Sequence, residues 1–274
     1  MKGTKLYRRW YNRVKEPPTN DFLLVLSASS KSAVSGTGKT TVATGLAKTL
    51  DSSPSGFDAE SQATLSAGEL GYEIIPEVEN RSAVIIDEAQ GTPGAGSAMN
   101  KRRSMKTETI ETISSILANR DKGLTIIVVV QQFQMLDAWL LPLVDAWVLI
   151  RRGPGHPQGE LATHHKVQVD DYDLQSPTLK TPAIEDLRWP ALPETDPDYQ
   201  VMERKKQEAK RRSQDGEEGG DQLPKTAQMK MAQAFRDQGH SLQWIADNIE
   251  EIEYSRETIR KNTEAPDGVA SAKA

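Results

Sequence analysis

The chain has 274 residues, of which 36% are hydrophobic and 27% charged, and it contains no cysteine. This length suits one or two domains with a buried core, and the absence of cysteine excludes a disulfide scaffold, a cysteine-ligated zinc site and thiol catalysis. The formal net charge of −5 excludes a protein that coats nucleic acid over its whole surface, so local basic patches must carry any such binding.

Residues 1–20 form a basic segment with interleaved aromatic side chains, Tyr7, Trp10 and Tyr11. Such a segment can pair with phosphates and stack on bases. We favour a short helix whose aromatic side chains pack on the main domain while its basic face stays solvated. The segment lacks the apolar core of a signal peptide, and no later apolar run reaches the ~20 residues of a membrane span. We therefore expect a cytoplasmic protein without a membrane span.

Residues 21–190 are expected to form an α/β domain, because apolar runs alternate with helical patterns. Continuous apolar runs predict strands buried on both faces at 22–27, 82–86, 124–130 and 146–150. Helical patterns occupy 40–50, 110–117 and most of 136–143, and 161–169 is expected to be an edge strand. Strands separated by helices predict a parallel sheet that is covered on both sides.

A phosphate-binding loop (Walker A) is predicted between the first strand and the helix at 40–50. Glycines in this segment allow backbone N–H groups to converge on a phosphate, and the following helix presents its positive N-terminal end. We expect Lys39 to reach the β- and γ-phosphates and the hydroxyl of Thr40 to bind Mg²⁺. Ala33 replaces the first glycine of the pattern, which affects the pattern match more than the chemistry. The expected nucleotide-binding residues are Ser35, Gly36, Thr37, Gly38, Lys39, Thr40 and Thr41.

Two adjacent carboxylates, Asp87 and Glu88, follow the apolar strand at 82–86 and form an expected Walker B motif. Asp87 is expected to hold the water shell of the metal, and Glu88 to accept a proton from the attacking water. Two acids at the end of a strand can also simply solvate a turn. Beside a phosphate-binding loop, however, the catalytic interpretation is favoured.

Polar residues also follow the strand at 124–130. Successive residues of a strand face opposite ways, so only one of Gln131 and Gln132 can sense the attacking water and the γ-phosphate, and we favour Gln131. A hydrolytic site also gains from an arginine, often supplied by a neighbouring subunit. Candidates for this arginine finger are Arg120, Arg151 and Arg152, while Arg102 and Arg103 suit DNA contact equally well.

The combination of Ser35-Gly-Thr-Gly-Lys-Thr40, Val84-Ile-Ile-Asp-Glu-Ala89 and a strand ending in Gln131 resembles the P-loop ATPases with an additional strand and a catalytic glutamate. Within that class the chain is most similar to the HerA/FtsK-type and related ATPases of archaeal viruses and mobile elements. The resemblance implies ATP as the nucleotide, a phosphate-loop strand next to the sensor strand, and a homo-oligomer with six subunits expected. A complete superfamily-2 helicase is disfavoured because no second α/β lobe follows residue 152.

Residues 191–224 are expected to form a charged linker, and residues 264–274 a disordered tail. Between them, residues 225–263 regain helical periodicity, with Ser241 and Ser255 as expected N-caps. Apolar residues of this segment form an expected small core: Phe235, Trp244, Ile245, Ile249, Ile252 and Ile259.

This segment resembles the helix-turn-helix of resolvase-like DNA-binding modules, in Gly239-His-Ser-Leu-Gln-Trp-Ile-Ala246 and Ser255-Arg-Glu-Thr-Ile-Arg260. The resemblance implies a recognition helix in which Arg256 and Thr258 face bases while Arg260 and Lys261 contact phosphates. A protein-docking helical module is the alternative, since the segment carries acidic and basic side chains in balance.

The sequence thus predicts an Mg²⁺-dependent ATPase that couples hydrolysis to DNA binding or movement, in packaging, transfer or maintenance of viral or mobile-element DNA. An ATP-switched DNA-binding regulator or partition factor with slow turnover is the alternative. A small-molecule kinase is disfavoured, because it needs a lid and an acceptor pocket.

Overall fold

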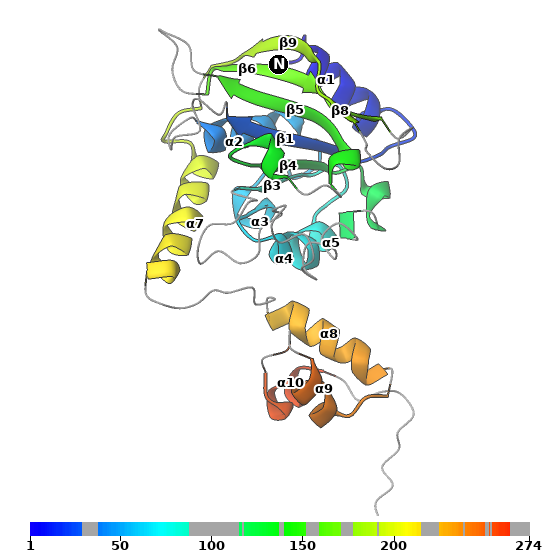
Figure 1. The fold of residues 1–274 in the computed structure, drawn as a ribbon. Coiled ribbons are helices and arrows are strands. Elements are labelled where there is room, and N and C mark those ends of the chain that lie inside the picture. Colours follow the sequence, from blue (N-terminus) through cyan, green and yellow to red (C-terminus); the bar gives the residue numbers. More distant parts are fainter. Residues whose placement is uncertain are drawn as a thin grey trace, which may run out of the picture. The chain divides into compact units, whose positions relative to one another are not determined.

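Figure 1 shows the computed structural model of the chain, which divides into two compact units, Met1–Gly220 and Asp221–Ala274. The two units are described separately below. The structure describes residues 1–28, 38–87, 115–116, 118–136, 140–151, 159–170, 178–190, 192–214, 225–237, 239–249, 252 and 254–263. Most of the predicted helix at 110–117 and the tail at 264–274 lie outside these residues.

The first unit is built on a sheet with the strand order β2-β3-β4-β1-β5-β6-β9. Pairing is parallel from β2 to β5, and antiparallel between β5, β6 and β9. The predicted α/β class is confirmed, with the parallel part formed by the four predicted strands and β2. The strands are β1 (Phe22–Ala28), β2 (Ala63–Thr64), β3 (Ala83–Ile86), β4 (Thr125–Val129), β5 (Val144–Arg151), β6 (Leu161–Lys166) and β9 (Ala183–Arg188).

The prediction that residues 161–169 form an edge strand is wrong, as the order of the sheet shows. β6 lies inside the sheet because β9 pairs along its outer side, from Leu161 opposite Arg188 to His165 opposite Ala183. The rest of the predicted strand, β7 (Gln168–Asp170), leaves the main sheet and pairs with β8 (Thr178–Lys180). The polar side chains of β9 gave no strand signal, which is why the sequence placed the edge one strand too early.

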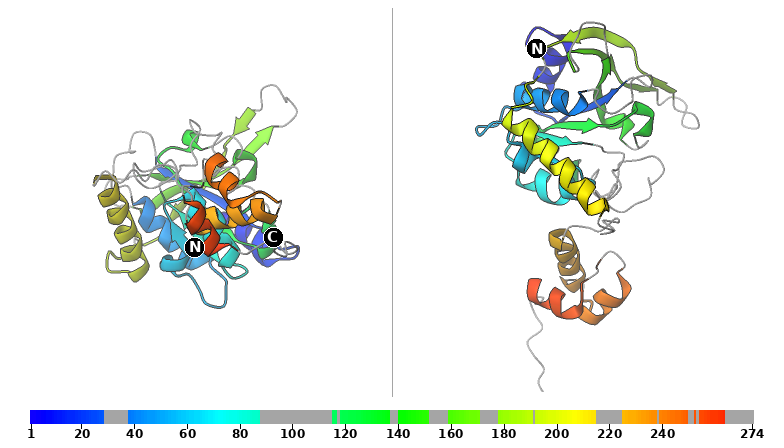
Figure 2. Two further views of the ribbon diagram at one scale, coloured as in Figure 1. Left: turned by 90° about the horizontal axis from the view of Figure 1, so that it is seen from below. Right: turned by 90° about the vertical axis from the view of Figure 1, so that its left-hand side faces the viewer.

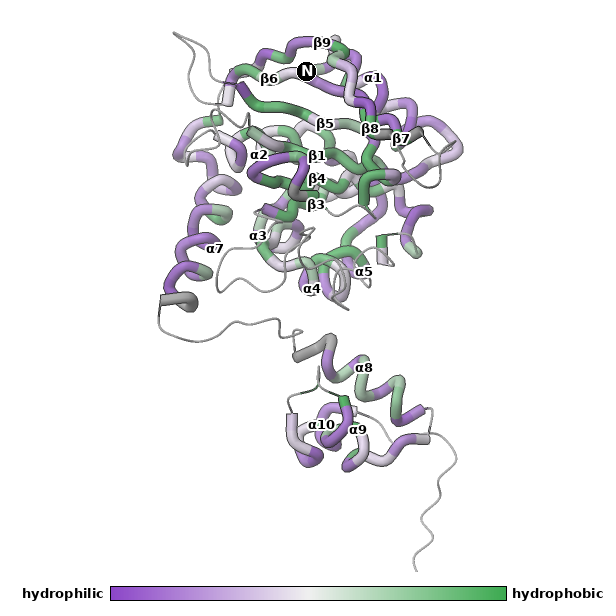
Figure 3. Tube along the Cα trace, in the orientation of Figure 1, coloured by the Kyte–Doolittle hydropathy of each residue, from purple (hydrophilic) through white to green (hydrophobic). Residues whose placement is uncertain are grey.

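Alternate residues of β1 are buried in two separate apolar clusters. Leu24 and Leu26 belong to the cluster that includes Leu46 of α2, whereas Leu23 and Val25 belong to the cluster on the other face. The strands are therefore buried on both faces, as their continuous apolar runs predict. Figure 3 shows these strands as the most hydrophobic part of the unit.

Helices and short helical turns cover the sheet. Trp10 of α1 is buried, and its indole N–H donates a 2.8 Å hydrogen bond to Oγ1 of Thr125, so this aromatic side chain packs on the domain as we favoured. In the predicted helix at 136–143, the described residues form only a 3-10 turn, Leu141–Leu143, that contains Pro142. The helices are α1 (Lys5–Trp10), α2 (Lys39–Leu50), α3 (Ala59–Gln62), α4 (Ala67–Glu69), α5 (Ile75–Glu77) and α7 (Pro197–Gln214), and a π-helical turn, Tyr11–Lys15, continues α1.

Helix α7 corrects the expected charged linker at 191–224. Figure 2 shows α7 (yellow) along α2 and α3, and its Met202 is fully buried in the core. Lys205 donates hydrogen bonds to the carbonyl oxygens of Ala59, Glu60 and Ala63. Lys205 of this helix thus has partners in the core domain that are distant in the sequence.

The second unit contains α8 (Lys225–Asp237), α9 (Leu242–Asn248) and α10 (Arg256–Asn262), packed around a small core with Ile245 and Ile259 fully buried. The predicted N-cap at Ser241 is confirmed, since its Oγ accepts a hydrogen bond from the backbone N–H of Trp244. Two expectations are corrected. Trp244 is 38% exposed and stacks on His240 instead of filling the core. Ser255 is the N-cap residue of α10 as predicted, but its Oγ pairs with Oγ1 of Thr258 and makes no capping hydrogen bond to the backbone.

Among the described helices, none combines the length and the apolar character needed to cross a bilayer.

Candidate active site

The predicted nucleotide site lies at the edge of the sheet where the parallel strands end. β1, β4 and β3 are neighbours, so the segments that follow them emerge at this same edge. α2 begins there with Lys39, and Gly38 is its N-cap with φ 78° and ψ 21°. This left-handed conformation favours glycine, which explains the residue at this position. Ser35, Gly36, Thr37 and Glu88 lie outside the described residues.

Thr40 and Asp87 are brought into direct contact at this edge. The Thr40 hydroxyl donates a 2.7 Å hydrogen bond to Oδ2 of Asp87, and the two residues are only 7% and 1% exposed. The position of Asp87 is fixed by its backbone N–H, which donates to the carbonyl of Thr64 in β2. The two motifs that the sequence assigns to phosphate and metal binding thus meet through a pair of buried oxygen atoms.

The donor set at this contact suits Mg²⁺. Mg²⁺ prefers oxygen ligands and is usually held by one or two carboxylates together with substrate phosphates and waters. Among the described residues, no group of three or more His, Asp or Glu side chains could hold a metal by itself. One hydroxyl and one carboxylate are a donor set that fits a metal whose other ligands are phosphates and waters.

A cationic side chain that the sequence analysis missed contacts the same two oxygens. Nζ of Lys206, from α7, lies 2.8 Å from Oδ2 of Asp87 and also contacts Oγ1 of Thr40. Its side chain is 15% exposed. A cation therefore occupies the position expected for the metal, and it comes from a segment that was interpreted as a linker.

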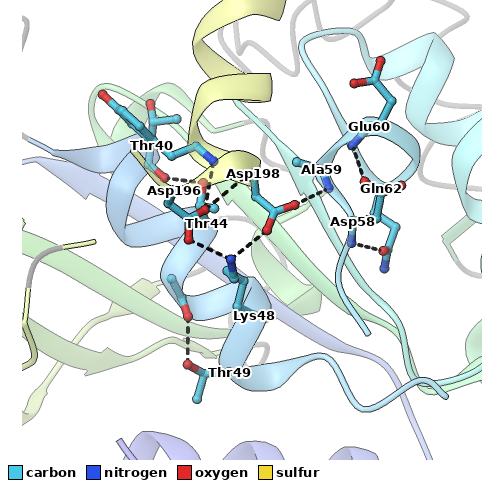
Figure 4. A network of polar contacts seen from close by, with 12 residues as sticks. Thr40, Thr44, Lys48, Thr49, Asp58, Ala59, Glu60, Gln62, Asp196 and Asp198 are labelled. Carbon is cyan, nitrogen blue, oxygen red and sulfur yellow. Dashed lines mark hydrogen bonds and ion pairs between the residues drawn. The ribbon is translucent and has the colours of Figure 1, made fainter. Parts of the chain in front are cut away.

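Ion pairs hold α7 against α2 beside this site. Nζ of Lys48 lies 2.7 Å from Asp196 and 2.8 Å from Asp198, and Asp198 also accepts a hydrogen bond from the backbone N–H of Ala59 (Figure 4). Although burial opposes its charge, hydrogen bonds with the two aspartates raise the pKa of Lys48. Thr41, the residue after Thr40 in α2, is joined to Tyr199 by a side-chain hydrogen bond.

A glycine from the connection between β5 and β6 packs on the start of α2. Gly159 has φ +83°, and a Cβ on it would lie 3.1 Å from Cγ2 of Val42 and 3.3 Å from the carbonyl oxygen of Gly38. That carbonyl accepts the first hydrogen bond of the helix, from the N–H of Val42. Nothing in the local sequence around Gly159 indicated this contact.

The described sensor and arginine candidates lie in different parts of the unit, and Arg102, Arg103 and Arg152 lie outside the described residues. Gln131 follows β4 at the same edge and is exposed, and Gln132 is half-buried. Arg151 pairs with Asp186 of β9 at 2.6 Å. Arg120 precedes β4 and therefore lies at the opposite edge of the sheet, where it lines a cavity with Asp21 and Asp145.

Buried carboxylates at that opposite edge bind backbone N–H groups of the strands. Asp21 accepts a 2.7 Å hydrogen bond from Leu124, and Asp145 accepts a 3.0 Å hydrogen bond from Leu23. Burial raises the pKa of Asp21 to about 6, against the opposing effect of the Leu124 hydrogen bond. These hydrogen bonds stabilise the strands at the edge of the sheet that lies away from the nucleotide site.

The predicted DNA-contacting residues lie on α10 of the second unit. Arg256, Arg260 and Lys261 are exposed, whereas Thr258 is half-buried. Arg260 pairs with Oε1 of Glu257 at 2.8 Å. Part of the positive charge on this helix is therefore neutralised by its own acidic residue.

No protein-family model matches the sequence, and no curated protein matches it. Among solved structures, the N-terminal domain of zonular occludens toxin from Neisseria meningitidis is similar, with 15% identity, a TM-score of 0.36 and coverage of 61% of this chain and 96% of that one. The genome packaging NTPase B204 from Sulfolobus turreted icosahedral virus 2 is also similar in its complex with AMPPCP, with 14% identity, a TM-score of 0.33 and coverage of 60% and 99%. Its complex with ATP-gammaS gives 14% identity, a TM-score of 0.32 and coverage of 60% and 98%.

Proposed function

We propose that this protein is an Mg²⁺-dependent ATPase whose nucleotide site is formed by the start of α2 and the ends of β3 and β4. The observation that carries the proposal is the 2.7 Å hydrogen bond between Thr40 and Asp87. It joins a residue that follows a glycine-rich, lysine-containing loop to an acid at the end of a buried strand. This is the pairing that a magnesium nucleotide requires, because the metal must be held beside the phosphates.

Each residue of the site has a distinct proposed role. The backbone N–H groups of Ser35 to Thr41 and the Lys39 ammonium bind the phosphates, and the positive end of α2 adds to their attraction. Thr40 and Asp87 hold Mg²⁺, which neutralises charge on the phosphate oxygens when it is bound. Glu88 accepts the proton of the attacking water, and Gln131 orients that water.

We further propose that hydrolysis is coupled to DNA, in packaging, transfer or maintenance of viral or mobile-element DNA, and that the protein works as a homo-oligomer. The exposed Arg256 and Arg260 and the adjacent Lys261 support DNA binding by α10. An arginine supplied by a neighbouring subunit would complete the catalytic site, which is the physical reason to expect assembly.

Phosphate release from ATP tests the proposal when it is measured with and without double-stranded DNA over a range of protein concentrations. The expected result is Mg²⁺-dependent turnover that DNA stimulates and whose specific activity rises with protein concentration. A turnover rate that DNA does not change would contradict the coupling to DNA. A specific activity that does not change with protein concentration would contradict the requirement for a neighbouring subunit. Absence of ATP binding at saturating Mg²⁺ overturns the proposed function itself.

A further inference from the structure

We propose that Lys206 is an internal cation that occupies the Mg²⁺ position while the nucleotide is absent and must leave it before a magnesium nucleotide can bind. This inference rests on the proposed function of the site. If it is correct, a residue of α7 affects how strongly the affinity for nucleotide depends on Mg²⁺.

The contacts of Lys206 are those expected of the metal. Its Nζ lies 2.8 Å from Oδ2 of Asp87 and contacts Oγ1 of Thr40, the two protein oxygens of the proposed magnesium site. Asp87 is 1% exposed, and a buried carboxylate without a cationic or hydrogen-bonding partner is strongly unfavourable. Lys206 supplies such a positive charge in the structure.

Mg²⁺ and the Lys206 ammonium exclude each other at this position. Mg²⁺ binds its oxygen ligands or the waters around it at ~2.0–2.1 Å, whereas the ammonium lies within hydrogen-bond distance of both oxygens. Two positive charges in so small a buried volume repel each other, and one centre cannot fill a position held by the other. Metal entry therefore requires the lysine side chain to move.

The surroundings of Lys206 allow its side chain to move without moving α7. Lys205, the preceding residue, binds three carbonyl oxygens of the α3 region, and Lys48 fixes the first turn through Asp196 and Asp198. Oε1 of Glu203 lies 3.8 Å from Nζ of Lys206, and its side chain is 40% exposed. Glu203 is therefore a second anionic partner to which the displaced ammonium can turn.

This exchange lowers the affinity for the magnesium nucleotide but not for the metal-free nucleotide. A metal-free triphosphate can bind beside Asp87 with the lysine still in place, whereas a magnesium nucleotide must first displace it. The apparent affinity for the magnesium form is lowered by the fraction of molecules in which the position is already occupied. Removing the lysine charge should therefore increase the benefit that Mg²⁺ gives to nucleotide binding.

Calorimetric titration with AMPPCP tests this inference, once in EDTA and once in saturating Mg²⁺, on the full chain. The measured quantity is the ratio of the two dissociation constants. Lys206→Met is expected to increase the Mg²⁺-dependent gain in affinity at least about fivefold over wild type. Lys206→Arg, which keeps the charge, and Lys210→Met, which removes an exposed lysine one turn along α7, are expected to leave the ratio unchanged.

An unchanged ratio in Lys206→Met, with AMPPCP binding intact, overturns the role of Lys206 and leaves the proposed function standing. If the wild-type protein does not bind AMPPCP in either condition, the proposed function is overturned instead. Lys206→Gln provides a second uncharged variant in case the methionine variant does not fold, as judged by circular dichroism. A ratio in Lys206→Gln equal to that of wild type contradicts the inference equally.

Discussion

The backbone of Gly159 lies directly against that of Gly38, so that a methyl group at position 159 would lie 3.3 Å from the carbonyl oxygen of Gly38. Both glycines have positive φ, and Gly38 is the N-cap of α2. The connection between β5 and β6 therefore helps to fix the point at which the predicted phosphate-binding loop enters its helix. This contact makes the nucleotide site sensitive to a residue that belongs to neither motif.

Gly159→Ala is expected to weaken nucleotide binding about tenfold, because the added methyl group displaces Gly38 or Val42 and a non-glycine residue at this φ costs about 1–3 kcal/mol. Titration with a fluorescent ATP analogue measures the effect. Gly56→Ala is the matched control, since Gly56 has φ +74° but open space around its Cβ direction. Equal affinity losses in the two variants would show that backbone strain, and not the contact with Gly38, is responsible.

Asp21 should make the folded state less stable as the pH rises from about 4 to about 6. Burial raises its folded-state pKa from 3.8 to about 6, so in this interval the folded protein binds more protons than the unfolded chain. The contribution of Asp21 to the free energy of unfolding is therefore fully present below pH 3.8 and is lost as the pH passes 6. The whole contribution is about 3 kcal/mol.

Asp21→Asn removes this dependence, and urea unfolding at pH 4 and pH 7 measures it. Relative to wild type, the free energy of unfolding of the variant should rise by about 2.4 kcal/mol between the two pH values. Any effect of the amide on the free energy of unfolding that does not depend on pH cancels in that comparison. A difference between variant and wild type that does not change with pH would contradict the raised pKa.

Glu257→Gln is expected to strengthen binding of double-stranded DNA several-fold, because Glu257 pairs with Arg260 at 2.8 Å and adds a negative charge to the proposed recognition helix. Lys261→Ala should weaken binding, and the lost phosphate contact should lower the salt dependence by about one unit of slope. Fluorescence anisotropy over a salt series measures both. Unchanged affinity in both variants would favour protein docking as the role of this module.

Glu88→Gln separates an ATPase from a nucleotide-driven switch. If Glu88 accepts the proton of the attacking water, the variant should bind ATP with wild-type affinity and hydrolyse it about 10²- to 10⁴-fold more slowly. Filter binding and single-turnover phosphate release provide the two measurements. Full hydrolysis by this variant would exclude the proposed general base.

The parallel part of the sheet could be predicted because each strand is buried on both faces and therefore forms a continuous apolar run. The same reasoning placed Thr40 and Asp87 near each other, since Asp87 was assigned to the end of one strand and Thr40 to the helix after the loop that follows another. β9 could not be predicted in this way, because its exposed side is polar and its partner β6 is remote from any hairpin signal.

Helix α7 shows a different limit of local sequence. Its run of lysines, arginines and glutamates is typical of a solvated linker, and Figure 3 shows it as mainly hydrophilic. The helix packs on the domain because some of those charges meet partners in it. Lys205 binds carbonyl oxygens of α3 and β2, Arg204 pairs with Glu60, and Lys206 pairs with Asp87 after β3. Lys206 was missed for this reason: its role depends on Asp87, which only the folded chain brings within 2.8 Å.

The proposed ATPase activity is tested most directly by the rate of Mg²⁺-dependent phosphate release from ATP, measured side by side for the wild-type protein and for Lys39→Ala. Circular dichroism checks that both proteins are folded. We expect hydrolysis by the wild type that is reduced at least about 100-fold in the variant, because the lysine holds the phosphates beside Thr40 and Asp87. Equal rates in the two proteins would contradict this expectation.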